Sequence, residues 1–316
     1  MSAILLGNGL NRCLDNYPSW DDLLRAISKT LFSNLGPKVN SLLKFDAMVC
    51  EAMSEYDEKT ANSRLHKELL KLDTPGAAII NSELYSSLLN AKVKTVLTTN
   101  YDYNLERALT QGSTSPLRGE EIKRLYTTET RASDKRHSLI GDIEIHHIHG
   151  EFDYENSICL GITKYIDNLA KTMELLSNAK TSTGPTNLRR LIDSSVFASK
   201  DCWKKTWAEL LFNSDIYIVG LGLSSDELDI WWLLMRRAQL LADPNLKEMI
   251  TNRIIYFPLV NDGSDFDTSP FEALHVDTKR CQVSDGGWRQ AYESIWSEIG
   301  CLEDQKRNAR QTGAAV

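Results

Sequence analysis

The sequence "VKTVLTTNYDYNLERALTQ" at residues 93–111 joins a strand pattern directly to a helix pattern. Residues 93–100 are rich in β-branched and apolar side chains, which is typical of a buried strand. Residues 103–111 have the apolar spacing of an amphipathic helix. A strand that turns at once into a helix is the repeating unit of a parallel sheet covered by helices.

Similar apolar runs recur along the chain, with helical patterns between them. We expect strands at residues 3–9, 143–150, 215–222 and 253–259, and helices at 19–32, 38–56, 83–91, 225–241 and 288–300. This order predicts an α/β fold with a Rossmann-like, mostly parallel sheet and helices on both faces.

Two stretches are longer than a crossover needs, and we interpret residues 33–92 and 164–212 as helical insertions, one of which could cap a pocket. The whole is expected to form a single domain over residues 1–302. A loose polar C-terminal tail would follow at residues 303–316.

Charge and cysteine content exclude several classes of protein. The net charge of −7 and the isoelectric point near 5.5 leave no domain-wide basic field for direct nucleic-acid binding. The six cysteines are scattered without a Cys-x-x-Cys pair, so we expect neither a zinc site nor a disulfide framework. The start of the chain lacks a basic signal-peptide region, and no apolar segment reaches membrane-spanning length. We therefore expect a cytoplasmic protein without membrane contact.

Two glycine turns follow predicted strands, "GNGLN" at residues 7–11 and "GLGLS" at residues 220–224. Glycine lets the backbone approach a phosphate, and the N–H groups of a following helix suit an anion. The third glycine of the dinucleotide fingerprint is absent, so an ordinary turn is the alternative for the first motif. After the second motif, Asp226 is interpreted as a helix cap. The "WWLLM" run at 231–235 reads as a helical core or oligomer face rather than a base-stacking platform.

The "TTNYD" segment at residues 98–102 divides between two roles. Asp102 and Asn104 are suited to start the helix that follows. Asn100 lies earlier, at the carboxyl end of its strand, which is where open α/β sheets bind their ligands.

The segment "IEIHHIHG" at residues 143–150 contains three of the six histidines. In strand alternation His147 and His149 share a face and could chelate a metal, but no carboxylate or cysteine motif completes a ligand set. His149 precedes Gly150 at the strand end, where a histidine can act as a base near neutral pH. His146 and His147 are interpreted as buried wall residues.

Taken in order, these four segments resemble the sirtuin-like family of NAD-binding proteins, whose site is marked by Gly-Ala-Gly-x-Ser, Thr-Gln-Asn-Ile-Asp, His-Gly and Gly-Thr-Ser. The resemblance covers residues 3–262, with Asn11 where the family often has serine. Protein deacylases of this family carry a four-cysteine zinc module and a Gly-Ile-Pro-x-Phe-Arg segment. This chain has neither and shows "NYPSWDDLL" instead at residues 16–24, so the resemblance does not favour a deacylase.

The chain is more similar to divergent sirtuin-like proteins of bacterial anti-phage systems, which as a group hydrolyse NAD on infection, often as oligomers beside a partner such as a HerA-type ATPase. The resemblance implies a homo-oligomeric NAD glycohydrolase that uses NAD as substrate and needs no zinc. Asn100 would orient the ribose hydroxyls and the attacking water, and His149 would accept a proton. The other residues that it implies for the NAD site are Gly7, Asn8, Gly9, Asn11, Thr98, Asp102, Gly220, Gly222 and Ser224. A protein that binds NAD or ADP-ribose without cleaving it is the main alternative, and a deacylase is the next.

Overall fold

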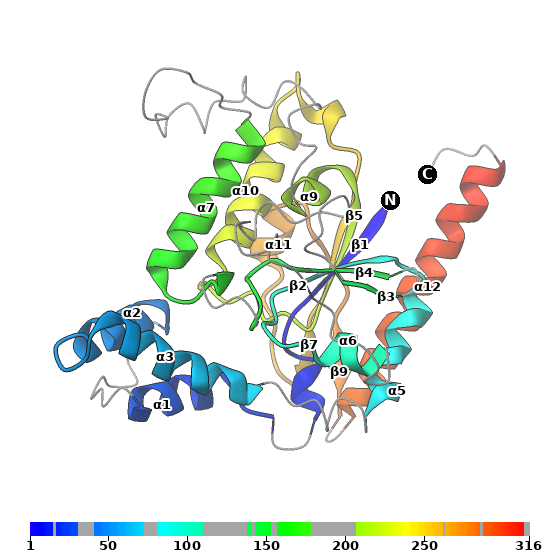
Figure 1. The fold of residues 1–316 in the computed structure, drawn as a ribbon. Helices are drawn as coiled ribbons and strands as arrows, with labels where there is room; N and C mark the ends of the chain where they lie inside the picture. Colours follow the sequence, from blue (N-terminus) through cyan, green and yellow to red (C-terminus); the bar gives the residue numbers. More distant parts are fainter. Residues whose placement is uncertain are drawn as a thin grey trace.

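A computed structural model describes residues 1–14, 17–30, 41–72, 81–109, 138–140, 143–152, 157–177, 207–261, 263–284 and 287–312. Its centre is a seven-stranded sheet in the order β3-β4-β2-β1-β5-β6-β8 (Figure 1). The strands are β1 Ser2–Leu6, β2 Thr95–Thr98, β3 Ser138–Ile140, β4 Ile143–His147, β5 Asp215–Val219, β6 Ile254–Phe257 and β8 Asp277–Thr278. Strand β3 pairs with β4 in antiparallel orientation, and the other pairs in this sheet are parallel. The predicted α/β class with a mostly parallel sheet is therefore confirmed.

The order of the strands brings four loops to one edge of the sheet. Leu6 at the end of β1 pairs with Thr98 of β2 and with Val219 of β5, and Thr98 pairs with His147 of β4. The chain builds β2 and β4 on one side of β1 and then returns to build β5 and β6 on the other. The point of reversal lies between β1 and β5, where open α/β sheets place their ligands. The segments that follow these four strands therefore all begin at the same edge of the sheet.

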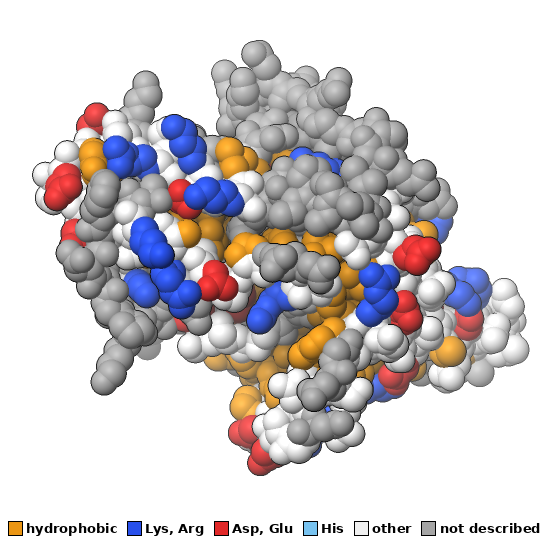
Figure 2. Space-filling model, turned by 90° about the horizontal axis from the view of Figure 1, so that it is seen from below, with side chains coloured by type: hydrophobic (Ala, Val, Ile, Leu, Met, Phe, Trp, Pro, Cys, Tyr) orange, Lys and Arg blue, Asp and Glu red, His pale blue; other side chains and the backbone are white. Residues whose placement is uncertain are grey.

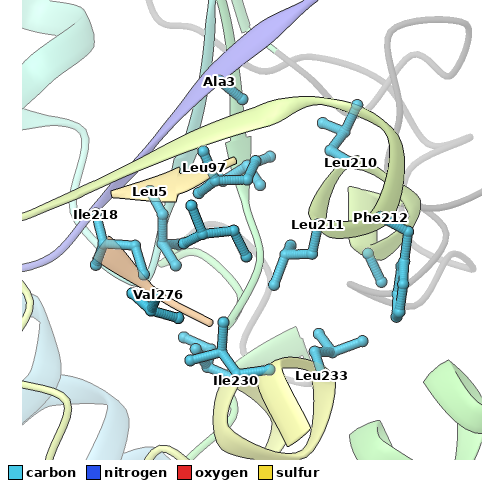
Figure 3. Packing of buried hydrophobic residues seen from close by; sticks show 14 of the residues in the cluster. Ala3, Leu5, Leu97, Leu210, Leu211, Phe212, Ile218, Ile230, Leu233 and Val276 are labelled. Carbon is cyan, nitrogen blue, oxygen red and sulfur yellow. The ribbon is translucent and has the colours of Figure 1, made fainter. Parts of the chain in front are cut away.

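Helices cover both faces of the sheet. Ala3 and Leu5 of β1 face a core packed against α9 (Leu210–Asn213), α10 (Leu228–Ala242) and α11 (Ser269–Ala273), part of which is drawn in Figure 3. Ile4 and Leu6 face the opposite core, packed against α5 (Ser82–Ser86), α6 (Asn104–Leu109) and α12 (Trp288–Thr312). This alternation is the period-two pattern of a strand buried on both sides. A second, two-stranded parallel sheet joins β7 (Leu259–Asn261) to β9 (Cys281–Val283).

The first predicted insertion is helical in its described part. It contains α2 (Ser41–Ala52), α3 (Glu58–Leu69), α5 and the short turns η2 (Leu70–Leu72) and η3 (Ser87–Ala91), and α1 (Trp20–Thr30) precedes it. Helices α1 to α3 share a core with Tyr101, Tyr103 and Phe152, and so pack directly beside the "TTNYD" segment. The second predicted insertion, residues 164–212, begins within α7 (Ile162–Ser177), includes η9 (Trp207–Glu209) and ends within α9, and residues 178–206 lie outside the described part. That either insertion caps a pocket stays a prediction.

The C-terminal helix extends further than the sequence suggested. Helix α12 continues to Thr312, so residues 303–312 are not a loose tail, while residues 313–316 lie outside the described part. The polar character of this segment reflects its partners. Glu303 accepts hydrogen bonds from Ser2 (2.8 Å) and Tyr217 (2.7 Å), and Lys306 pairs with Glu303 at 2.7 Å. These contacts hold the end of the helix against β1 and β5.

Positive and negative side chains are mixed on the surface that Figure 2 shows. On the face shown in Figure 2, Lys and Arg side chains lie among Asp and Glu side chains and do not form one basic field. Across the described residues, each helix is too short or too polar to cross a membrane.

Candidate active site

The two glycine loops pack directly against each other. Gly7 N–H donates to the Val219 carbonyl at 3.0 Å, and Gly9 N–H donates to the Gly220 carbonyl at 2.8 Å. A Cβ atom on Gly9 would lie 2.8 Å from that Gly220 oxygen. Glycine is therefore needed at this position so that the loops after β1 and β5 can meet, whether or not a phosphate binds there. Gly222 differs, because a Cβ there would have no neighbour within 4 Å.

The turn after the second glycine loop carries an exposed serine. Ser224 Oγ accepts a hydrogen bond from Asp226 N–H at 3.4 Å, and its carbonyl accepts one from Trp231 Nε1 at 2.8 Å. Helix α10 begins at Leu228 with Glu227 in the capping position. Asp226 therefore lies in the turn before the helix and is not its cap, because the helix starts at Leu228 and not at residue 225 as the apolar pattern indicated.

Asn11 connects the first glycine loop to the "TTNYD" loop. Its Nδ2 donates to Asp102 at 2.8 Å and to Asn8 Oδ1 at 3.0 Å, and its Oδ1 accepts from the Tyr85 hydroxyl at 2.6 Å. The side chain of Asn11 is buried, so both ends of its amide are engaged inside the protein. Asn11 therefore sets the relative position of two loops, and any effect on a bound pyrophosphate would pass through the shape of those loops.

Asp102 has the helix-starting role that the sequence indicated and a second one. Its Oδ1 accepts the N–H of Asn104, the first residue of α6, at 3.0 Å. Its Oδ2 accepts from Asn11 and, at 3.2 Å, from the Tyr17 hydroxyl. Burial raises the pKa of Asp102 to about 6, although the hydrogen bond from Asn104 acts to lower it.

The backbone of Asn100 is held by hydrogen bonds, while its side-chain oxygen has no hydrogen-bond partner among the described residues. Its N–H donates to Thr98 Oγ1 at 3.1 Å, and Thr98 Oγ1 itself donates to the Leu6 carbonyl at 3.1 Å. The Asn100 Nδ2 lies 3.5 Å from the Gly7 carbonyl. Its Oδ1 is buried and has no hydrogen-bond partner among the described residues. Buried polar atoms are nearly always satisfied, so an open acceptor at this edge of the sheet points to a ligand or a water molecule.

His147 holds the backbone of Asn100 in place. Its Nδ1 lies 2.7 Å from the Asn100 carbonyl, and its Nε2 lies 2.8 Å from Glu106 of α6. A carbonyl oxygen can only accept, so Nδ1 carries a proton. Burial alone acts to lower the pKa of His147, but Glu106 and further partners outweigh it and raise the pKa to about 9. At neutral pH His147 is therefore a buried cation that is paired with Glu106 and clamps the backbone of Asn100.

His149 is held by a carboxylate on the other face of the sheet. Its Nε2 lies 3.1 Å from Asp229 Oδ2, and Asp229 also accepts from Asn168 Nδ2 at 3.2 Å. Both His149 and Asp229 are buried. Burial acts to lower the pKa of His149, but Asp229 and Glu227 outweigh it and raise the pKa. Asp229 thus fixes the imidazole and stabilises its protonated form, as in other carboxylate–histidine pairs.

Gly150 allows the chain to turn directly after His149. Its φ angle is +96°, and a Cβ there would lie 2.7 Å from the Ile158 Cα. The chain then returns alongside, and the Cys159 N–H donates to the His149 carbonyl at 2.7 Å. The His-Gly pair therefore serves to place one imidazole rigidly at the edge of the sheet.

The two histidines do not share a face. Strand β4 ends at His147, so the strand alternation that would place His149 on the same face stops before it reaches His149. His147 contacts α6 on one side of the sheet and His149 contacts α10 on the other. A joint metal site of these two residues is therefore excluded by geometry. His146 is buried and lies 3.0 Å from Glu144, in agreement with its predicted wall position.

A different group has a spacing that could suit a metal ion. One ligand atom from each of His149, Glu227 and Asp229 can be chosen so that all lie within 4.8 Å of one another. However, the two nitrogens of the imidazole face different carboxylates: Nε2 faces Asp229 at 3.1 Å and Nδ1 faces Glu227 at 3.8 Å. A carboxylate on each side of a ring can share protons with it, whereas a single ion can bind only one of its nitrogens. The group is better suited to holding protons.

Several residues of this arrangement were missed by sequence reasoning. Asp229, Glu227 and Glu106 were treated as ordinary helix residues, and Tyr165, which packs edge-on against the His149 ring with centroids 5.2 Å apart, lay in an insertion. The available signal was the acidic run in "SSDELD" directly after the second glycine loop.

The region that contains the candidate site matches a known protein family. Residues 94–236 match the family model of a SIR2-like domain, which supports a sirtuin-like family for the chain. The matched region begins just before β2 and extends into α10, and so includes Asn100, His149 and Asp229. No curated protein matches the chain closely enough to be counted as a relative. SIR2-like domains bind NAD, so the match is compatible with an NAD-related activity.

Proposed function

We propose that the protein hydrolyses NAD at the bond between nicotinamide and ribose, giving nicotinamide and ADP-ribose. The observation that carries this proposal is the His149–Asp229 pair, with Nε2 and Oδ2 separated by 3.1 Å, at the same sheet edge as the open side-chain oxygen of Asn100. The match to a SIR2-like domain supports the choice of NAD as substrate.

The reaction needs one acceptor of hydrogen bonds and one acceptor of protons. As the bond between nicotinamide and the ribose C1′ breaks, its electron pair leaves with nicotinamide and positive charge develops on the ribose. A water oxygen then bonds to C1′ and releases a proton. The open Oδ1 of Asn100 would hold a ribose hydroxyl or that water, and His149 would take the proton. Asp229 would stabilise the resulting imidazolium.

The pH dependence of the reaction follows from the same pair. The carboxylates around His149 raise its pKa above the ordinary value of 6.5. Only the unprotonated imidazole can accept a proton, so nicotinamide release should increase as the pH rises through and above that value.

The test uses Asn100→Ala and His149→Ala, with Asn245→Ala and His275→Asn as matched controls on exposed residues. We expect the first two proteins to remain folded and to lose nicotinamide release by 100-fold or more, on the order expected for acid–base groups. Both controls should match the wild type. Full turnover in Asn100→Ala and His149→Ala would refute the assignment.

The same assay separates the alternatives. Binding of intact NAD by the wild type without product over hours would show a sensor rather than a hydrolase. A rise in nicotinamide release that depends on an acylated peptide would show a deacylase.

A defence role belongs to the same proposal. The likeness to sirtuin-like proteins of anti-phage systems supports NAD depletion on infection, by a homo-oligomer that acts with a second protein such as a HerA-type ATPase. Nicotinamide release measured with and without the genomic neighbour, together with the mass of the assembly in solution, tests this part.

A further inference from the structure

We infer that Glu227 is the group through which the His149 pair receives its proton, so that Asp229, His149 and Glu227 form one relay with Glu227 at the substrate end. This inference rests on the proposed hydrolysis of NAD and names a further catalytic residue for it. The carboxylate would accept the proton of the attacking water directly.

Exposure distinguishes the three members of the relay. The side chain of Glu227 is 19% exposed, whereas that of His149 is 2% exposed and that of Asp229 is 0% exposed. A water molecule that attacks a bound substrate must come from the accessible side. The carboxylate of Glu227 is therefore the member of the group best placed to meet it.

The tautomer of His149 directs its free nitrogen toward Glu227. Asp229 is an acceptor when ionised, so in neutral His149 the proton resides on Nε2, which faces Asp229 at 3.1 Å. The lone pair is then on Nδ1. This atom lies 3.8 Å from Glu227 Oε2 and 3.4 Å from the Tyr165 hydroxyl.

Tyr165 connects the last two members of the relay. Its hydroxyl lies 3.5 Å from Glu227 Oε2 and within the same range of His149 Nδ1, so a single hydroxyl contacts both groups. A hydroxyl can donate one proton and accept another, which allows it to pass a proton between them. Its ring also packs on the imidazole and keeps both in place.

The electrostatic environment suits a carboxylate that accepts protons. Burial raises the pKa of Glu227, while His149 opposes this and Asp229 and Asp226 add to it. The hydrogen bond from Tyr165 acts to lower the pKa. Tyr101 and Cys159 also face Glu227, and its charge acts to raise the pKa of each.

The proton balance of the step is complete without a further reactant. The bond between nicotinamide and C1′ breaks and its electron pair leaves with nicotinamide. A water oxygen bonds to C1′ and transfers one proton to the Glu227 carboxylate. The resulting carboxylic acid passes that proton to Nδ1 of His149 through Tyr165, and the imidazolium, stabilised by Asp229, returns it to solvent.

The test compares Glu227→Gln with Glu248→Gln, the same change at an exposed glutamate outside the relay. Nicotinamide release at saturating NAD is measured from pH 5 to pH 9, and the Kd for NAD is measured by calorimetry. We expect Glu227→Gln to lower kcat by at least about tenfold with its Kd within about threefold of the wild type. The pH range over which the rate of Glu227→Gln increases should also differ from that of the wild type. Glu248→Gln should behave as the wild type.

A second variant separates the loss of the carboxylate from a change at the start of α10, because Glu227 also occupies the capping position of that helix. Glu227→Asp keeps a carboxylate but shortens its reach, so its rate should lie between those of the wild type and Glu227→Gln with the wild-type pH profile. If Glu227→Gln keeps the wild-type kcat and pH profile, or if both variants lose activity equally, the relay is refuted while NAD hydrolysis stands. If the wild type itself releases no nicotinamide, the proposed function fails and the relay fails with it.

Discussion

The buried pair of His147 and Glu106 should make the stability of the protein depend on pH. The pKa of His147 is raised from the ordinary value of 6.5 to about 9 in the folded protein. A group with a raised folded pKa stabilises the protein fully below its unfolded pKa, and this stabilisation is lost as the pH rises through the folded pKa. One pKa unit corresponds to about 1.4 kcal/mol, so the raised pKa of His147, to which Glu106 makes the largest favourable contribution, corresponds to about 3 kcal/mol at pH 6, most of it lost by pH 9.

Urea unfolding measures this dependence, with tryptophan fluorescence as the signal, since Trp207 and Trp296 are fully buried. The free energy of unfolding is determined for the wild type and for Glu106→Gln at pH 6, 7, 8 and 9. Glu106→Gln removes the charge that raises the pKa of His147, so its stability should be lower at pH 6 and should vary less with pH. Glu293→Gln, a change of an exposed glutamate on α12, is the matched control and should show the wild-type dependence.

The test rests on how the free energy of unfolding changes with pH in the wild type compared with Glu106→Gln. Other groups also titrate in this range, among them His149, but they are present in all three proteins and cancel in the comparison. If wild type and Glu106→Gln lose the same free energy between pH 6 and pH 9, His147 does not titrate against Glu106. The description of His147 as a buried cation would then be wrong.

Three further changes test the packing of the site and of the C-terminal helix. Gly150→Ala should destabilise the protein by about 2 kcal/mol or more, because of the φ angle of +96° and the contact with Ile158, while Gly222→Ala should change it by less than about 0.5 kcal/mol in urea unfolding. Tyr85→Phe should cost about 1–3 kcal/mol by leaving the buried Asn11 oxygen without its donor, and an unchanged urea midpoint would contradict that hydrogen bond. Lys306→Met should cost about 1–2 kcal/mol by leaving Glu303 and Asp215 without their cation, whereas Lys247→Met on an exposed turn should cost little in the same assay.

The central strands could be predicted from sequence because each is a dense apolar run. The edge strands β3 and β8 could not, since three and two residues carry no periodicity. The extension of α12 was also missed. Its polar residues make contacts with the start of β1 and with β5, which are distant in the sequence, and a polar composition alone does not distinguish such contacts from solvent exposure.

The positions of Asn100 and His149 in the fold could be predicted because each follows the carboxyl end of a strand. Their partners could not. Asp229 lies 80 residues from His149 in the chain, and an aspartate in the first turn of a helix is usually read as favourable to the helix dipole. The opposite orientations of His147 and His149 were missed for another reason, since the end of β4 at His147 is set by the turn at Gly150 and not by the apolar pattern.

The two halves of the candidate site are controlled from opposite faces of the sheet. His147 and Glu106 on one face fix the backbone of Asn100, and Asp229 on the other face fixes the imidazole of His149. Ile148 lies between the two histidines and donates its N–H to the Thr98 carbonyl at 2.9 Å, which keeps both in register with β2. Changes on the α6 face should therefore alter how a substrate is oriented and raise KM, whereas changes on the α10 face should alter proton transfer and lower kcat. A Glu106→Gln protein with an unchanged KM and a reduced kcat would contradict this division.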